Sequence, residues 1–420
     1  MSFDHLKGDK PKGSANDWDN RPELHGIIRQ EDFEFVNTIN KCTVGKLGEE
    51  WEENVKRNKI IWRRNPKLNS LRGLGKNKCV IGIGAGPSFK KNQEVLKRIV
   101  WNDGVRPWEQ RDFITIASNH QFKPLLEMGI IPDFVLLVDA GNDAVYDQLC
   151  RDIHLSGKNT TLLTGVHVLP KIAKNWTKQG RNIVMYTTNA PNVKKAFSKY
   201  ISRNHEGIEL GGNVLNGAWM IGLSVFNSTV FFGVGNDLSF ELRDTIEEQR
   251  KSYYHDGDYT TNAAETGSGR DEAASEKKWA GYRLEKRRII DPFAKDGCLK
   301  RYNVELDLVG TSYTLWVYKA WIESTIMAQT QNPVHFHYFN CTEGGIVGVM
   351  AKEVTDSALR DPNNWYLMDG VAINKHTGAC MYHTCMLNDA AELFINTKRS
   401  YTWQEPQDAQ YADGHSQRLN

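Results

Sequence analysis

The sequence predicts an α/β protein built on a doubly wound, mainly parallel sheet. Short β-branched or apolar runs alternate with helix-length segments from about residue 79 to residue 234. Several of these runs end in Gly, Ser, Asn or Asp, which turn the chain or begin a helix. Strands separated by helix-length connections favour a parallel sheet with right-handed crossovers. In such a sheet the polar strand ends meet at one edge, where ligands gather.

The first predicted strand, residues 80–83, runs into the turn Gly84-Ala85-Gly86-Pro87-Ser88, and a helical pattern through Leu96 and Ile99 follows. Such a corner gathers backbone N–H groups, a helix N-terminus and a hydroxyl, which suits a phosphate. It matches neither of the best-known phosphate loops. Phe89 stands where the dinucleotide fingerprint needs a third glycine, and no Gly-Lys-Ser/Thr follows. A tight structural connection is the alternative interpretation.

The other elements are predicted from apolar residues at helical spacing and from β-branched or aromatic runs. Strands are expected at 113–117, 134–138, 161–164, 183–186, 229–234 and 334–339. Helices are expected at 122–128, 172–176, 193–200, 214–226 and 313–329. The basic run 285–288 is predicted to be a solvated helix face, and a hairpin turning at 375–378 and an amphipathic helix at 389–396 are predicted near the end.

Composition limits the class of protein. A chain of 420 residues with 40% hydrophobic residues can bury a large core, and a net charge of +2 does not favour a nucleic-acid partner. Seven scattered cysteines are typical of reduced thiols, so a cytoplasmic location is expected. The polar first residues predict no signal peptide. The most apolar window, residues 214–234, is interrupted by Asn and Ser, so no membrane span is expected.

Changes in composition predict four regions. Residues 1–24 are expected to be a disordered tail, and residues 25–75 a helical N-terminal extension. Residues 76–345 are expected to form the α/β core, with a polar loop inserted at 255–278. Residues 346–420 are expected to form a small C-terminal α+β module.

Polar groups follow several predicted strands and should meet at one edge of the sheet. They are Ser118-Asn119, Asp139, Gly211-Gly212-Asn213, Gly235-Asn236-Asp237 and the run 340–345. Glycine turns and hydroxyls suit a nucleotide, while the carboxylates of Asp139 and Asp237 could bind ribose or a divalent cation. Any one of these residues alone could simply cap a helix.

These motifs, in this order, resemble one superfamily over roughly residues 66–350. The order is Gly-Ala-Gly-Pro-Ser, Ser-Asn, Gly-Ile-Ile-Pro-Asp-Phe with Asp139, Gly-Gly-Asn-Val, Gly-Asn-Asp-Leu-Ser-Phe and Asn-Cys-Thr-Glu-Gly-Gly-Ile. The superfamily contains archaeal 6-hydroxymethyl-dihydropterin diphosphokinases and motility-associated glycosyltransferases that modify flagellin. Residues 91–97 and the late Thr-Glu-Gly-Gly are more similar to the glycosyltransferases.

The resemblance implies a Rossmann-like, nucleotide-binding fold with a sialyltransferase-like Gly-Pro-Ser turn. It implies phosphate contacts by Gly84, Gly86 and Ser88, and contacts to base or ribose near Asn119. Asp139, Asp237 and Glu343 would face the donor. The full predicted nucleotide-binding set is Gly84, Gly86, Pro87, Ser88, Asn119, Asp139, Gly212, Asn213, Thr342 and Gly344, and the predicted catalytic residues are Asp237, His167 and Glu343.

Three functions remain open at this point. A glycosyltransferase would use a CMP-nonulosonic acid donor and needs no metal, but it needs a base such as His120, His167 or Asp237. A diphosphokinase would use ATP and Mg²⁺, with Asp139 and Asp237 as metal ligands. A nucleotide-binding or structural protein without turnover is the third reading. The expected partner is a nucleotide-activated small molecule. No permanently bound cofactor is expected, and the sequence does not identify the acceptor.

Overall fold

The computed structural model describes residues 47–239 except 142 and 152–154, and seven shorter stretches beyond them. These stretches are 283–293, 301–311, parts of 315–326, 336–347, 365–368, 371–374 and 382–400. The predicted tail at 1–24 and the polar loop at 255–278 lie outside the described residues.

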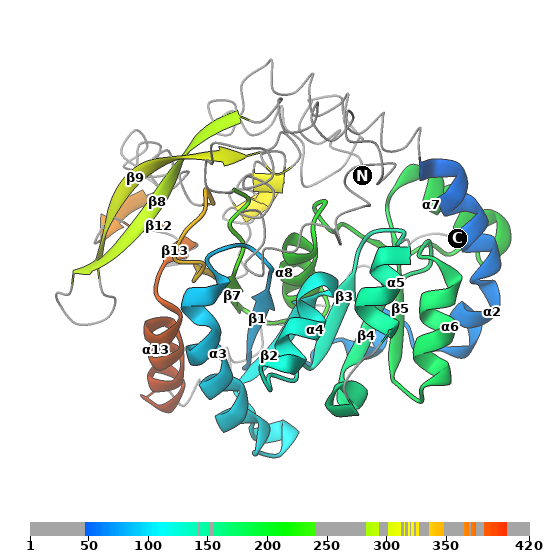
Figure 1. Ribbon diagram of the computed structural model, residues 1–420, viewed down its shortest axis with the longest axis horizontal. Helices are drawn as coiled ribbons and strands as arrows, with labels where there is room; N and C mark the ends of the chain where they lie inside the picture. Colours follow the sequence, from blue (N-terminus) through cyan, green and yellow to red (C-terminus); the bar gives the residue numbers. More distant parts are fainter. Residues whose placement is uncertain are drawn as a thin grey trace, which may run out of the picture.

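A nine-stranded sheet forms the centre of the molecule (Figure 1), in the order β13-β10-β7-β1-β2-β3-β4-β5-β6. Every pairing in this sheet is parallel. The strand order reverses between β1 and β7, which confirms the predicted doubly wound fold. The strands are β1 (Cys79–Ile83), β2 (Phe113–Ser118), β3 (Phe134–Leu137), β4 (Thr161–Gly165), β5 (Ile183–Thr188), β6 (Gly207–Ile208), β7 (Val230–Val234), β10 (His337–Asn340) and β13 (Tyr382–Thr384).

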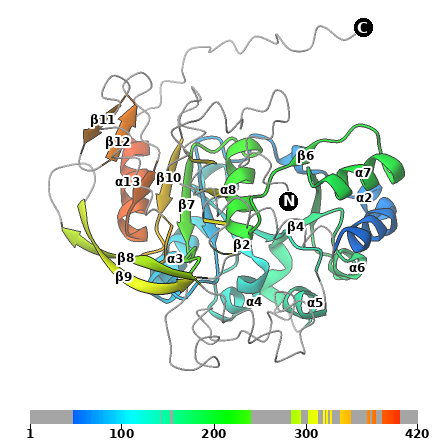
Figure 2. The ribbon, with the colours of Figure 1, turned by 90° about the horizontal axis from the view of Figure 1, so that it is seen from above.

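Helices cover both faces of the sheet, as Figure 2 shows. On β1, Ile81 packs in one cluster with α3, while Val80 packs in another with α8. The alternation of side chains along a strand produces this division. The helices are α2 (Lys59–Arg64), α3 (Phe89–Gly104), α4 (Asn119–Glu127), α5 (Asp143–Cys150), α6 (Pro170–Lys178), α7 (Pro191–Tyr200), α8 (Val214–Ser224) and α13 (Leu387–Ser400), with 3-10 turns η4 (Leu68–Leu71), η5 (Trp108–Gln110) and η6 (Leu155–Asn159).

The C-terminal part of the chain corrects the boundary predicted at residue 345. Strand β13 extends the core sheet beside β10, and α13 packs on the same face as α3. Phe394 of α13 lies 5.6 Å from Phe113, ring centre to ring centre, and Lys398 pairs with Asp112 at 2.7 Å. Residues 382–400 are therefore part of the core and not of a separate module.

Two antiparallel pairs complete the described strands. β11 (Trp365–Met368) pairs with β12 (Val371–Asn374), while the turn predicted at 375–378 lies outside the described residues. β8 (Arg283–Phe293) pairs with β9 (Arg301–Thr311). The basic run 285–288 lies in β8 and not on a helix, because its charged residues stand next to the β-branched pair Ile289-Ile290, which favours an extended chain.

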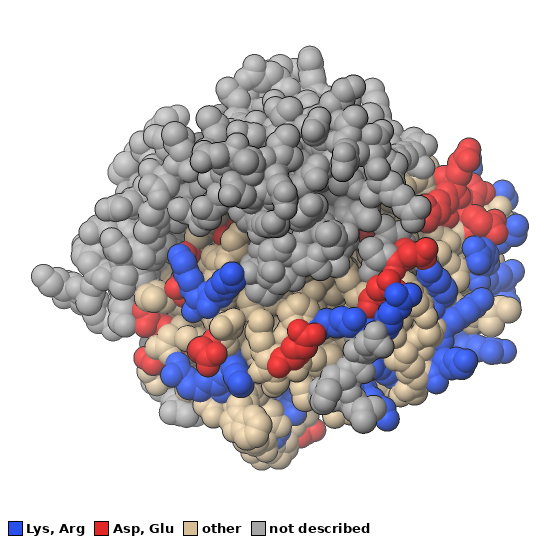
Figure 3. Space-filling view, in the orientation of Figure 1, with Lys and Arg blue, Asp and Glu red and all other residues tan. Residues whose placement is uncertain are grey.

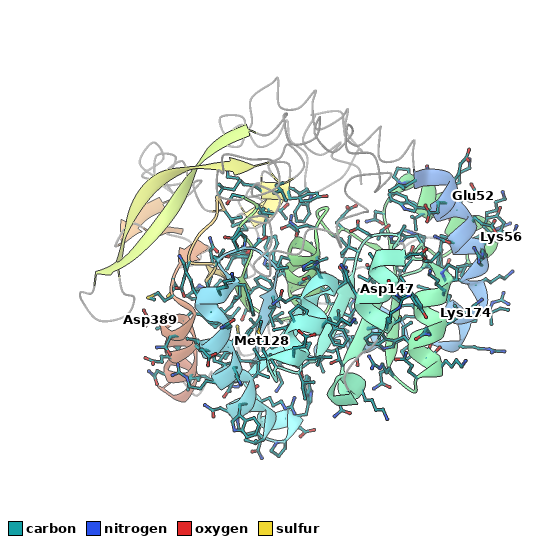
Figure 4. The ribbon with its side chains drawn as sticks, viewed as in Figure 1. Glu52, Lys56, Met128, Asp147, Lys174 and Asp389 are labelled. Carbon is teal, nitrogen blue, oxygen red and sulfur yellow. The ribbon has the colours of Figure 1, made fainter. Side chains whose placement is uncertain are left out.

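The described end of the N-terminal extension packs against the core. Residues 47–57 are helical, and Trp51 and Val55 lie in one buried cluster with Phe197 of α7. Glu52, labelled in Figure 4, accepts hydrogen bonds from Lys199 and Tyr200, each at 3.1 Å. This helix therefore covers the edge of the core beside β5.

On the face shown in Figure 3, both basic and acidic side chains lie on the described helices. Within the described ranges, no helix is both long enough and apolar enough to cross a membrane.

Candidate active site

A cavity of about 190 Å³ lies at the carboxyl ends of β1, β2, β3 and β7. This position next to the reversal of strand order is where open α/β sheets bind ligands. The described residues that line it are Gly84, Ala85, Gly86, Ser118, Asn119, His120, Asp139, Val145, Gln148, Gly212, Asn213, Val214, Leu215, Gly235, Asn236, Asp237, Leu238, Ser239, Leu315 and Tyr318.

The structure brings together many of the residues predicted from the sequence. Those that line the cavity are Gly84, Gly86, Asn119, Asp139, Gly212, Asn213 and Asp237. Those that do not line it are Pro87, Ser88, His167, Thr342, Glu343 and Gly344. The convergence follows from the parallel sheet, because it carries successive strand ends to the same edge.

The glycine turn after β1 does not offer its amides to a ligand as predicted. Gly84 N–H donates to the carbonyl of Val234 at 2.8 Å, and Gly86 N–H donates to the carbonyl of Gly235 at 3.0 Å. A side chain at Gly84 would collide with the Gly235 carbonyl. The two glycines therefore allow the ends of β1 and β7 to approach each other, and their N–H groups are used within the protein.

Asp237 occupies the N-terminus of α3. Its carboxylate accepts hydrogen bonds from the Ser88 hydroxyl at 2.8 Å and from the Ser88 N–H at 3.3 Å, and both side chains are buried. A carboxylate at this position is favoured by the partial positive charge of the helix end. The phosphate predicted at Ser88 would compete with this internal anion.

The segment after β10 holds Asp237 in place. Gly345, with a φ of +74°, passes against the backbone of Asp237, and Ile346 N–H donates to the Asp237 carbonyl at 2.9 Å. The Thr342 hydroxyl accepts from Asn236 N–H at 3.1 Å. Thr342 and Gly344, predicted to contact a nucleotide, therefore lie behind the cavity wall and support it.

We expect Asp237→Ala to lower the free energy of unfolding by about 1 to 3 kcal/mol, because the buried Ser88 N–H loses its acceptor. Urea unfolding of both proteins measures the difference. Asp143→Ala is the control, since Asp143 also lies in the first turn of a helix but pairs with Lys171 at the surface. An equal loss in the two variants would contradict the role assigned to Asp237.

A chain of polar side chains forms the wall beside α4 and α5. Ser118 caps α4 by accepting from Gln121 N–H at 3.3 Å. The Asn119 amide donates to Gln148 Oε1 at 2.7 Å, and Gln148 Nε2 lies 3.4 Å from His120 Nδ1. Gln148 was not predicted, although it lies three residues after Val145 in the helix that follows Asp139, on the same helix face.

His167 lies outside the cavity, in the core under the N-terminal helix. Its Nε2 is 3.0 Å from the Val138 carbonyl, and Asn58 donates to the carbonyls of Val166 and Val168 on either side. Burial lowers the pKa of His167 to about 4, against the hydrogen bond to Val138, which raises it. A base must reach the proton that it removes, so we do not retain His167 as a candidate.

Glu343 also faces the protein and not the cavity. Its Oε1 accepts from Asn92 at 2.8 Å and from Leu387 N–H at 3.3 Å, which links α3 to the start of α13. Burial raises the pKa of this carboxyl, although these hydrogen bonds and Lys91 act in the opposite direction. The predicted catalytic role of Glu343 is therefore replaced by a structural one.

The cavity contains two carboxylates that fit a Mg²⁺ ion only in part. Asp139 and Asp237 line the same cavity, but the oxygens of Asp237 already accept hydrogen bonds from Ser88. In the described part of the chain, no three His, Cys, Asp or Glu side chains gather to hold a metal. Mg²⁺ often takes one or two carboxylates together with phosphate oxygens and several waters, so a bound nucleotide and waters would supply the rest of its shell.

Residues 52–242 match the family model described as 6-hydroxymethylpterin diphosphokinase MptE-like. The match confirms the predicted resemblance to the superfamily. The MptE-like segment contains β1 to β7, and of the described lining residues only Leu315 and Tyr318 lie beyond it.

One solved structure with a similar fold is that of the MAf glycosyltransferase from Magnetospirillum magneticum AMB-1. It has a TM-score of 0.43 and 15% sequence identity, over 85% of this chain and 42% of that chain. The chain therefore spans less than half of the length of that glycosyltransferase. The comparison with curated proteins found no match.

Proposed function

We propose that this chain is a nucleotide-dependent transferase, and specifically a glycosyltransferase that uses a nucleotide-activated sugar of the CMP-nonulosonic acid type. The observation that supports this choice is the charge of the cavity. Asn, Gln, Ser and His side chains line it together with two carboxylates, and none of the described lining residues is Lys or Arg.

The number of phosphate charges distinguishes the candidate donors. A nucleoside triphosphate brings several negative charges, which proteins neutralise with Lys, Arg and Mg²⁺. A CMP-sugar carries a single phosphodiester charge, and neutral N–H donors suffice for such a group. The cavity of about 190 Å³ is smaller than most sites for whole drug-sized ligands, so its described walls enclose one part of such a donor.

In the proposed reaction an acceptor hydroxyl oxygen attacks the anomeric carbon of the sugar. The bond from that carbon to the phosphate oxygen breaks, and its electron pair leaves with CMP. A base takes the proton of the hydroxyl. His120 is the candidate, because it lines the cavity at the N-terminus of α4 while His167 does not. The acceptor is a small molecule or a protein that this chemistry does not specify.

A Mg²⁺- and ATP-dependent diphosphokinase is the second candidate, favoured by the MptE-like match. In that reading Asp139 and Asp237 would bind the metal, and the metal would neutralise the phosphates of ATP. A nucleotide-binding or structural protein without turnover is the third.

A thermal-shift series with CMP, CDP, ATP and GTP, each with and without Mg²⁺, separates the three. Stabilisation by cytidine nucleotides without Mg²⁺ supports the glycosyltransferase. A strict requirement for ATP together with Mg²⁺ supports the diphosphokinase. If no nucleotide stabilises the protein, the result supports a protein without turnover and contradicts the proposed nucleotide-dependent transferase.

We expect His120→Gln to slow the release of CMP from a CMP-nonulosonic acid by about 10² to 10⁴-fold, with little change in the CMP-induced thermal shift, because general base catalysis contributes about this much. His205→Gln is the control, since His205 binds the Thr188 carbonyl and does not line the cavity. Equal rates in wild type and His120→Gln would exclude His120 as the base.

A further inference from the structure

Two Asn side chains in the cavity have amide groups without a hydrogen-bond partner. Asn236 follows β7 and is 4% exposed, and its buried Nδ2 has no hydrogen-bond partner among the described residues. Asn213 caps α8, and its Nδ2 likewise has none. Both residues line the cavity. A buried N–H group without an acceptor costs about 1 to 3 kcal/mol. Among the described lining residues, no other buried side-chain nitrogen or oxygen atom lacks a partner, so these two donors stand out.

The orientation of Asn213 explains why its donor remains available. Its Oδ1 accepts from Asn216 N–H at 2.8 Å, in the usual geometry of an N-cap. The oxygen is therefore fixed toward α8, and the amide nitrogen is on the other side of the same group. The N-terminus of α8 adds a partial positive charge here. At the N-terminus of α3, in contrast, the Asp237 carboxylate already occupies the place of an anionic ligand.

The backbone of Asn236 is fixed in the same way. Its N–H donates to the Thr342 hydroxyl at 3.1 Å, and Gly235 before it adopts a φ of +66°. The backbone is thus held at the cavity wall, and the side chain is buried there. The structure thus places a buried amide donor without a described acceptor at the point where β7 ends, and a ligand oxygen can provide that acceptor.

From these observations we infer that Asn236, together with Asn213, binds the phosphate oxygens of the nucleotide donor through the two side-chain amides. This assignment rests on the proposed function. It moves the expected phosphate site from the Gly84–Ser88 turn to the neighbouring end of β7 and the N-terminus of α8. It also explains how a cavity without a described Lys or Arg in its lining can hold an anion, since N–H donors bind charged oxygens strongly.

The test is Asn236→Leu, which keeps the branched shape of the side chain and removes the polar amide. In the unliganded protein we expect unchanged or higher thermal stability, because an unsatisfied donor is removed. We expect the dissociation constant of CMP to rise about 10- to 100-fold, the loss of one hydrogen bond to a charged group. Binding of cytidine, which has no phosphate, should not change. Calorimetric titration with both ligands measures these values.

Asn54→Leu is the matched control. Asn54 is 2% exposed, and its Nδ2 also has no partner, but it lies in the N-terminal helix and does not line the cavity. This variant should gain stability in the same way and bind CMP as the wild type does.

Three other outcomes would contradict the assignment of Asn236, and each has a different meaning. If Asn236→Leu binds CMP as tightly as the wild type, Asn236 does not contact the ligand, and the proposed function stands without it. If CMP and cytidine lose affinity equally, Asn236 contacts the nucleoside and the phosphate assignment is wrong. If the wild type binds neither CMP nor cytidine, the proposed function fails, and the inference fails with it.

Discussion

Gly84→Ala is expected to lower the free energy of unfolding by roughly 2 to 3 kcal/mol and to remove nucleotide binding. The new methyl group would collide with the carbonyl group of Gly235 and would lie 3.1 Å from a methyl carbon of Leu215. A backbone atom cannot move aside as a flexible side chain can, so β1 and β7 must separate. Because both strand ends form the cavity wall, its shape changes with them.

Gly104→Ala provides the matched control for this substitution. Gly104 is the last residue of α3, and a methyl group there would meet no atom within 4 Å. We expect its stability to equal or slightly exceed that of the wild type, because alanine restricts the unfolded chain. Thermal and urea unfolding of the three proteins measure the effect. If the two glycine variants were equally stable, the close contact between β1 and β7 would not be required for the stability of the fold.

Acidification should destabilise the protein through His167. The folded protein keeps this ring neutral down to a pKa of about 4, whereas the unfolded chain protonates it near 6.5. Between these values the unfolded state binds more protons, so stability falls as the pH falls. The contribution of the neutral His167 ring to the free energy of unfolding is complete above about pH 6.5. Roughly 3 kcal/mol of this contribution is lost by about pH 4.

Urea unfolding of wild type and His167→Gln at half-unit steps from pH 4.5 to 7.5 tests this expectation. The variant should be less stable at pH 7, because it loses the ring contact with Trp51 and the hydrogen bond to Val138. The slope of its free energy of unfolding against pH should be smaller than that of the wild type by up to about 1.4 kcal/mol per pH unit. Parallel pH profiles for the two proteins would count against a neutral, buried His167.

The doubly wound, mainly parallel sheet could be predicted from the sequence because it depends on local signals. Apolar runs such as Phe113–Ser118 and the helix-length gaps between them are visible in the chain, and right-handed crossovers then determine the sheet. The position of Asp139 and Asp237 at one edge follows from the same rule. What could not be predicted is which groups are already used by the protein itself.

The misassigned site residues show this limit. Ser88 and Glu343 are polar residues at turns, which is typical of both binding residues and structural ones. Ser88 pairs with a residue 149 positions away, and Glu343 pairs with one 251 positions away. Such long-range partners have no local signal. The same reason explains why the joining of β13 and α13 to the core was not predicted: β13 has only three residues, too few to show a pattern.

The sheet has a consequence for how the polypeptide folds as it is made. β10 and β13 lie beside β7, yet they are synthesised long after the MptE-like segment ends at residue 242. Until they emerge from the ribosome, β7 is an uncovered edge that could pair with other chains, and Asp237 lacks the loop that holds it. A fragment limited to that segment should therefore be prone to aggregate, and the cavity can reach its final form only after β10 and the loop that follows it have been synthesised.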